Sequence, residues 1–173
     1  MCYRLYLATP LTLSEVRSML PAGVTAHVAG TREQRLLRDH LPGAQMVLEI
    51  QRGNCACDFV IQRDPANRTD ETWLRGRGIR AGVPRDRLNQ IIQKHRLPER
   101  RVQPLEHWQR ALADFVAEHA RNAGPSLYHR GFTASGQRAH DPDAEPVRVS
   151  VSQVRSAPGE WLADDRLTLV VRD

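Results

Sequence analysis

Residues 2–8 of the chain read CYRLYLA, and this stretch predicts the first strand of a sheet. Its odd positions are apolar and fall on one face of an extended chain, while its even positions fall on the other face. Thr12 and Glu15 then have the spacing of a capping box, which predicts a short helix that ends near Pro21. The chain therefore opens with a strand followed by a helix.

The alternation typical of strands and the three-to-four-residue spacing typical of helices continue along the chain. Further strands are predicted at 24–29, 46–51, 55–62, 126–132, 146–154 and 166–171, and further helices at 31–41, 85–96 and 104–122. Gly53 and Asn54 predict a hairpin turn between the third and fourth of these strands. We therefore expect one α+β (or α/β) domain over 1–173, a mixed sheet of about six or seven strands with three or four helices packed on it.

Composition excludes several classes of protein. The chain has 173 residues, 40% of them hydrophobic, and no stretch approaches the roughly 18–20 apolar residues of a membrane helix. The first ten residues lack the basic start and long apolar core of a signal peptide. The odd number of cysteines, three, indicates free thiols in a reducing compartment. We therefore expect a cytoplasmic protein with no membrane association.

Two segments differ from the rest in composition. Residues 63–101 carry eleven basic and five acidic side chains, a net charge of +6, whereas the remainder of the chain sums to −1. The segment is also rich in glycine and proline, so we expect an Arg-rich surface excursion at about 63–103. The polar residues at about 133–146 predict a mobile loop.

The cysteines form the first candidate site. Cys55 and Cys57 are two residues apart on a predicted strand, so both sulfurs would lie on one face and could bind one soft metal ion. If the strand at 2–8 is a neighbour, Cys2 becomes the third ligand, and a histidine or water would complete zinc. The histidines considered are His27, His40 and His129. Thiol redox chemistry, an N-terminal nucleophile at Cys2 after removal of methionine, and plain burial of small apolar side chains are alternatives.

The basic segment forms the second candidate site. Residues 74–94 carry a faint helix-turn-helix pattern, with Gly82 at the turn and a second helix that starts near Pro84. The segment 74–96 could bind nucleic acid or an acidic partner through a set of basic side chains, namely Arg75, Arg77, Arg80, Arg85, Arg87 and Lys94. A solvated loop with one amphipathic helix is the alternative, and a GC-rich genome would also explain the abundance of arginine.

Three stretches carry a resemblance to a known group. MCYRLYLAT at the start, GNCACDFV in the middle and SLYHRG with VSVSQV and LTLVV at the end resemble a group of small uncharacterised bacterial proteins. That group opens with a Met-Cys strand and has a Gly-rich Cys-x-Cys-x-Phe strand. The resemblance covers residues 1–62 and 104–172, and this chain departs from it at Asn54 and Ala56. It implies strand boundaries and the grouping of the two central cysteines, but no known activity.

These observations favour a soft-metal or thiol-redox site formed by Cys2, Cys55 and Cys57, with zinc as the expected cofactor. They leave open whether any reaction is catalysed. The alternative is a module that binds nucleic acid or an acidic partner through residues 74–96. An interaction protein without chemistry of its own is a third interpretation. The sequence does not determine the oligomeric state.

Overall fold

The computed structural model describes residues 2–53, 55–60, 75, 79, 83–95, 104–133 and 145–173. The chain divides into two units by its internal contacts. The larger unit joins residues 1–61 to residues 105–173, and the smaller unit comprises residues 62–104. We describe each unit by itself.

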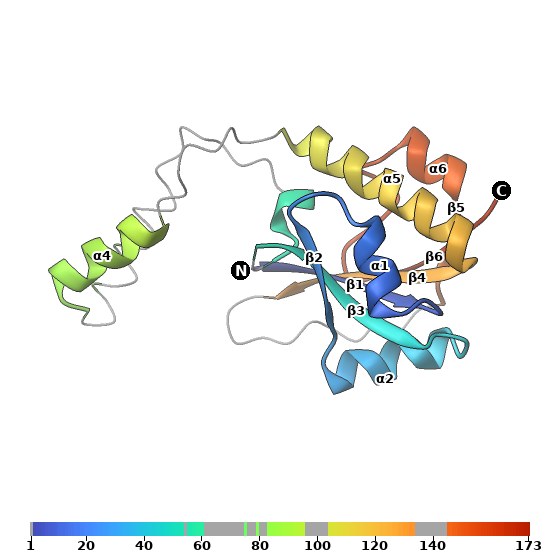
Figure 1. The fold of residues 1–173 in the computed structure, drawn as a ribbon, viewed down its shortest axis with the longest axis horizontal. Coiled ribbons are helices and arrows are strands. Elements are labelled where there is room, and N and C mark those ends of the chain that lie inside the picture. The colour runs from blue at the N-terminus through green and yellow to red at the C-terminus, as the bar shows by residue number, and fades with distance from the viewer. Residues whose placement is uncertain are drawn as a thin grey trace. The chain divides into compact units, whose positions relative to one another are not determined.

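One mixed sheet of six strands organises the larger unit (Figure 1). Its spatial order is β2-β3-β1-β4-β6-β5, so the first strand of the chain lies inside the sheet. The strands are β1 (Cys2–Thr9), β2 (Val24–Val28), β3 (Met46–Arg52), β4 (Ser126–Thr133), β5 (Val147–Ser150) and β6 (Leu167–Val171). All neighbours are antiparallel except β5 and β6, which are parallel. The α+β class with a mixed sheet is therefore confirmed.

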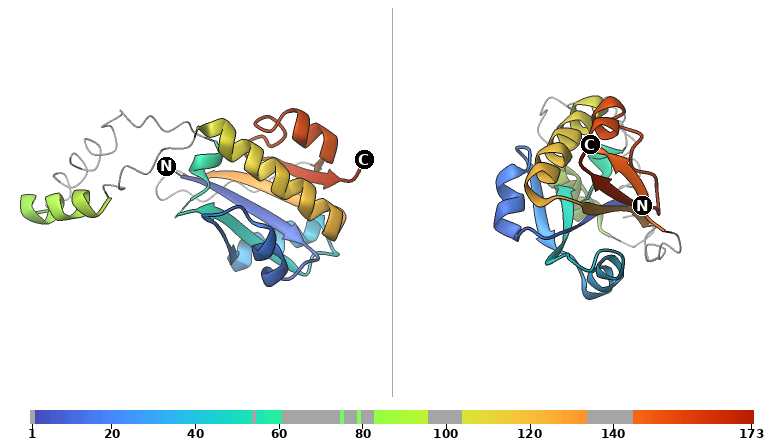
Figure 2. Two further views of the ribbon diagram at one scale, coloured as in Figure 1. Left: turned by 45° about the horizontal axis from the view of Figure 1, so that its top comes forward. Right: turned by 90° about the vertical axis from the view of Figure 1, so that its right-hand side faces the viewer.

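Helices cover both faces of the sheet (Figure 2). On one face, α1 (Leu13–Met19), α5 (Leu105–Ala123) and α6 (Val151–Ser156) pack on the odd-numbered side chains of β1. On the other face, α2 (Thr31–His40) packs through the buried Leu37 on a smaller apolar cluster. The alternation predicted for residues 2–8 therefore separates two hydrophobic cores.

The helix starts follow their capping residues. At α1, the Glu15 N–H donates to the Thr12 Oγ1 at 3.4 Å and the Thr12 N–H donates to the Glu15 side chain at 2.8 Å. The capping box predicted there is confirmed. A second capping box at Ser150 and Gln153 begins α6, so the strand predicted at 146–154 is wrong beyond Ser150. The reciprocal Ser150–Gln153 bonds satisfy the first free N–H groups of a helix, which outweighs the alternating valines.

A buried polar cluster, which we call the His119 network, lies under α5. His119 has no exposed surface. Its Nε2 is 2.9 Å from the Thr9 Oγ1 at the end of β1, and its Nδ1 is 3.2 Å from the Ser126 Oγ. The Tyr128 hydroxyl is 3.4 Å from the same Nδ1. Burial lowers the pKa of His119 to about 4 and raises that of Tyr128, so both side chains are neutral at pH 7.

In the smaller unit the structure describes one complete helix, α4 (Arg85–His95). The Leu88 N–H donates to the Pro84 carbonyl at 2.9 Å, so the helical bonds begin at Pro84 as predicted. Arg75 and Ile79 also have helical backbone. The predicted excursion at 63–103 corresponds to this unit in sequence, and most of the predicted loop at 133–146 lies outside the described residues. No helix in the described parts of either unit is long and apolar enough to cross a membrane.

Candidate functional site

The two central cysteines lie on a turn that follows β3. The chain reverses at Gly53, where φ is +70°, and the Arg52 N–H donates to the Cys55 carbonyl at 2.9 Å. Residues Cys57–Phe59 then form one turn of 3-10 helix, η1. We call residues 52–60 the cysteine turn.

The strand predicted at 55–62 is therefore wrong for its described part. A strand places successive side chains on opposite faces, whereas Cys55, Ala56, Cys57, Asp58 and Phe59 are all buried. Two contacts explain the compact conformation. Phe59 packs edge-on against Trp108 of α5, and the guanidinium of Arg52 forms an ion pair with Asp58 across the turn. The turn thus closes on itself before a second hydrogen-bonded strand can form.

Main-chain N–H groups point at both sulfurs. The Tyr3 N–H donates to the Cys57 Sγ at 3.4 Å, and the Cys57 N–H donates to the Cys55 Sγ at the same distance. The Ala56 N–H also donates to the Tyr3 carbonyl at 2.9 Å, which ties the cysteine turn to the start of β1. Both sulfurs belong to free cysteines that are 9% exposed. Each sulfur is therefore held by a main-chain N–H group within a largely buried turn.

The third predicted ligand is next to this turn in the backbone. Cys2 is the first residue of β1 and precedes Tyr3, whose N–H contacts the Cys57 sulfur. Its side chain lies outside the described structure, so the three-cysteine cluster and the shared side of its sulfurs stay predictions. Among the described residues, no three Cys, His, Asp or Glu side chains form a group that could hold a metal ion.

The histidines considered as a fourth ligand lie elsewhere. His27 is exposed on β2, and His40 is the last residue of α2. His129 is buried on β4, where its ring stacks on Tyr6 at a centroid distance of 6.0 Å. Tyr6 lies on the α2 side of the sheet, and burial together with Glu49 raises its pKa to about 12. None of these histidines forms a metal group with the described sulfurs.

One ion pair lies within the cysteine turn and a second lies beside it, and neither was predicted from the sequence. Arg52 pairs with the buried Asp58, and its guanidinium also lies 4.1 Å from the ring centroid of Trp108. On β4, the Nε of Arg130 donates to the Asp164 carboxylate at 2.6 Å. Both guanidinium groups therefore already have a carboxylate partner. Arg52 and Asp58 are six residues apart, which is the one hint of a pair that the sequence offers. The sequence gives no hint of the pair between Arg130 and Asp164.

Tyr3 links the second ion pair to the cysteine turn. Its hydroxyl donates to the Asp164 carboxylate at 3.4 Å, and Arg130 lies 5.8 Å from the centre of its ring. Burial raises the pKa of Tyr3, Asp164 raises it further, and Arg130 opposes the rise. The phenol is therefore protonated at pH 7 and donates a hydrogen bond beside the cysteine turn.

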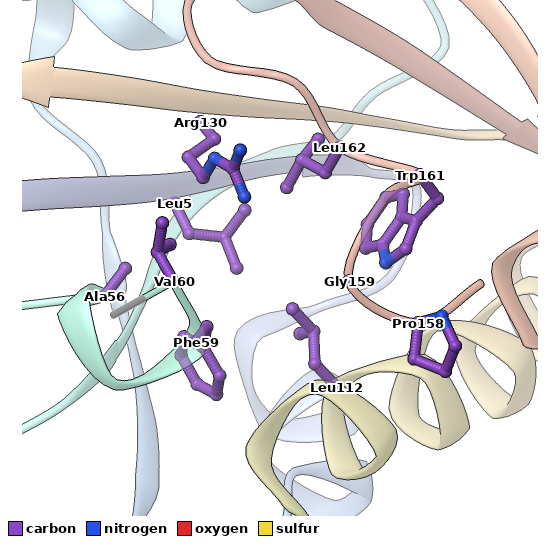
Figure 3. A pocket seen from close by; sticks show the side chains of 10 residues that line it. All are labelled: Leu5, Ala56, Phe59, Val60, Leu112, Arg130, Pro158, Gly159, Trp161 and Leu162. Carbon is purple, nitrogen blue, oxygen red and sulfur yellow. The ribbon is translucent and has the colours of Figure 1, made fainter. Parts of the chain in front are cut away.

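A small apolar pocket lies next to the turn (Figure 3). Arg130 is its one charged lining residue, and its guanidinium points toward the apolar side chains around it. The other lining residues come from β1, the cysteine turn, α5 and the loop after α6; they are Leu5, Ala56, Phe59, Val60, Leu112, Pro158, Gly159, Trp161 and Leu162. The enclosed space has room for about one water molecule. It is too small for an organic substrate.

The basic residues of the second candidate site are only partly described. The side chains of Arg75, Arg85 and Arg87 are exposed. Lys94 lies in α4, but its side chain is outside the described structure, as are Arg77 and Arg80 altogether. The grouping of all six residues therefore stays a prediction.

Comparison with protein-family models, with curated proteins and with solved structures gives no match to this chain. The resemblance to a group of small bacterial proteins therefore stays a prediction.

Proposed function

We propose that the cysteine turn binds one soft metal ion through Cys55 and Cys57, with Cys2 as a third ligand. The observation that carries this proposal is the pair of N–H···S contacts made by the Cys57 and Tyr3 main chains. Such donors orient a cysteine sulfur and offset the negative charge of a metal-bound thiolate. Thiolate ligands select Zn²⁺ and Cu⁺ over hard cations.

The surrounding charges favour metal binding over a reactive thiol. A nucleophilic thiolate needs an unpaired cation or a metal nearby to stabilise it. Arg52 is paired with Asp58, and Arg130 is paired with Asp164. A metal ion would supply the positive charge that these guanidinium groups do not offer. A reducing cytosol, the compartment we propose, would keep the thiols free for it.

The test is elemental analysis of full-length protein purified under reducing conditions. We expect about one zinc or copper ion per chain, because one tetrahedral site takes three sulfurs and one further ligand. Cys55→Ser and Cys57→Ser should each release it, and Cys2→Ser should weaken it. Cobalt added to the chelated protein should give sulfur-to-cobalt charge-transfer absorption that either substitution abolishes.

The control variant is Ser152→Ala. It removes an exposed hydroxyl from α6, which is remote in sequence from the three cysteines, and it should leave the metal content unchanged. Protein that contains no metal, takes up no cobalt and keeps its thermal stability after chelation contradicts the metal site. If such protein instead changes stability only on oxidation, the two cysteines act as a redox pair.

A second candidate function is the binding of a polyanion, either nucleic acid or an acidic protein, by residues 74–96. The observation that favours it is the exposure of Arg85 and Arg87 at the start of α4. Among the described residues, neither guanidinium forms an ion pair. Retention on heparin that is lost at high salt tests this candidate, and no retention at low salt contradicts it.

A further inference from the structure

The positive charge of the chain coincides with one structural unit. Residues 62–104 carry a net charge of +6, while the larger unit carries −1. The residues that form the smaller unit by their contacts are therefore the same residues that carry the excess positive charge. A basic unit attached to a nearly neutral one concentrates the electrostatic field where a polyanion would bind.

The described part of this unit exposes polar side chains suited to nucleic acid. Along the first turns of α4, Arg85, Arg87, Asn89 and Gln90 are exposed, while Leu88 is 4% exposed. Arginine binds phosphate or guanine with two parallel hydrogen bonds, and asparagine or glutamine binds adenine in the same way. Asp86 is the one acidic residue exposed among them, so the positive charge of this face is partly offset.

The described backbone starts α4 where the helix-turn-helix pattern of the sequence puts its second helix. Arg75 and Ile79 are helical, Val83 and Pro84 are not, and α4 begins at Arg85. In that motif the second helix enters the major groove and its N-terminal residues contact base edges. We infer that α4 binds duplex DNA, with its first turns in the major groove. This inference rests on the second candidate function.

Two other polyanions fit the unit less well. A single strand needs aromatic side chains on which bases stack, and Trp73 is the one aromatic residue in residues 62–104 of the sequence. An acidic protein would need apolar or aromatic anchors at the centre of its interface. Arginine, asparagine and glutamine on the first turns of a helix match the edges of a DNA duplex instead.

The test measures fluorescence anisotropy of a short labelled duplex DNA with the full-length protein over a series of salt concentrations. We expect affinity to fall steeply with salt, because each neutralised phosphate releases counterions. The double variant Arg85→Ala with Arg87→Ala should bind roughly tenfold more weakly and lower the salt slope by about two. The matched control is Arg155→Ala with Arg166→Ala, which removes two exposed arginines from the larger unit and should bind as the parent does.

Three outcomes overturn the inference. Equal losses in both double variants would show that only net charge matters. Tighter binding to a single strand or to polyglutamate than to the duplex would contradict DNA recognition while leaving the polyanion candidate standing. Absence of binding to duplex DNA, heparin and polyglutamate at low salt would remove both. Circular dichroism of each variant establishes that a loss of binding is not a loss of folding.

Discussion

The polar groups at the two ends of β1 differ in burial and in the kind of hydrogen-bond partner they have. At the Thr9 end, the His119 network is sealed under α5, and its ring nitrogens contact side chains from β1 and β4. At the Tyr3 end, Cys55 and Cys57 are each 9% exposed, and their sulfurs contact main-chain N–H groups. Side chains that are sealed and satisfied can contribute stability but cannot reach a ligand. The cysteine turn keeps some exposure, so a small ion can reach it.

Truncation of His119 should destabilise the Thr9 end of β1 more than any other change considered. His119→Ala removes a fully buried ring and the ring nitrogens that contact the Thr9 and Ser126 hydroxyls. We expect the free energy of unfolding to fall by about 3–5 kcal/mol, as for other buried aromatic truncations. Denaturant unfolding of the chelated protein measures this. The metal content before chelation should not change, and its loss would show that the two ends are not independent.

Low pH should also destabilise the His119 network, by less than the truncation of His119 does. The pKa of His119 is about 4 in the folded protein against an ordinary value of 6.5, so between these values the unfolded chain binds a proton that the folded chain does not. Stability present above pH 6.5 is therefore lost as the pH falls toward 4, by roughly 3 kcal/mol in total.

The matched variant is His119→Gln, because glutamine retains a polar side chain but does not titrate. The measurement is the free energy of unfolding at several pH values between 4 and 7, with the difference between parent and variant assigned to His119. A difference that stays constant over this range would contradict a neutral buried histidine.

Loss of the Arg52–Asp58 ion pair should destabilise the Tyr3 end of β1. Asp58→Asn removes the carboxylate that pairs with Arg52, and we expect a cost of about 1–2 kcal/mol, because Asp58 is 6% exposed while Arg52 can still contact water. The variant should also bind metal more weakly, since the pair holds the cysteine turn closed. The control is Glu49→Gln, which breaks the Arg4–Glu49 pair at 2.5 Å on β1 and β3. Equal metal affinity in both variants would contradict a role for Asp58 in shaping the site.

Backbone strain at Gly53, in the cysteine turn, should have the smallest effect on stability. Gly53→Ala places a side chain at φ +70°, where no neighbouring atom lies within 4 Å, so only backbone strain opposes it. We expect a cost of about 1 kcal/mol. Gly43→Ala also meets nothing within 4 Å but has no positive φ, and it should be nearly neutral. Thermal unfolding of the two variants compares them, and equal melting temperatures would contradict strain at Gly53.

Periodic patterns predicted most of the sheet. Strands such as 2–8 and 46–51 have one apolar face, and α5 has its apolar residues at helical spacing, so local pattern and burial agree. Residues 55–62 also looked like a strand, but the Arg52–Asp58 pair and the packing of Phe59 on Trp108 determine that turn. The packing of Phe59 involves α5, which is remote in sequence, and the alternation of a strand predicts neither contact.

The candidate site was predicted in part. The spacing of Cys55 and Cys57 identified two residues that the structure holds together, although for a different reason than shared strand alternation. Arg130 and Asp164 could not be predicted, because the loop after α6 brings Asp164 to β4 and nothing in the sequence predicts the path of that loop. The capping box at Ser150 and Gln153 was present in the sequence and could have predicted α6.

The position of β1 inside the sheet has a consequence for how the chain is made. Its two neighbours, β3 and β4, are encoded before and after residues 62–104. During synthesis β1 can pair with β3 early, but its other edge must wait until β4 leaves the ribosome. Long-range pairing of this kind is slow to form and leaves a strand edge open to other chains. The nascent protein therefore exposes this edge of β1 until β4 has left the ribosome, an interval that includes the whole translation of residues 62–104.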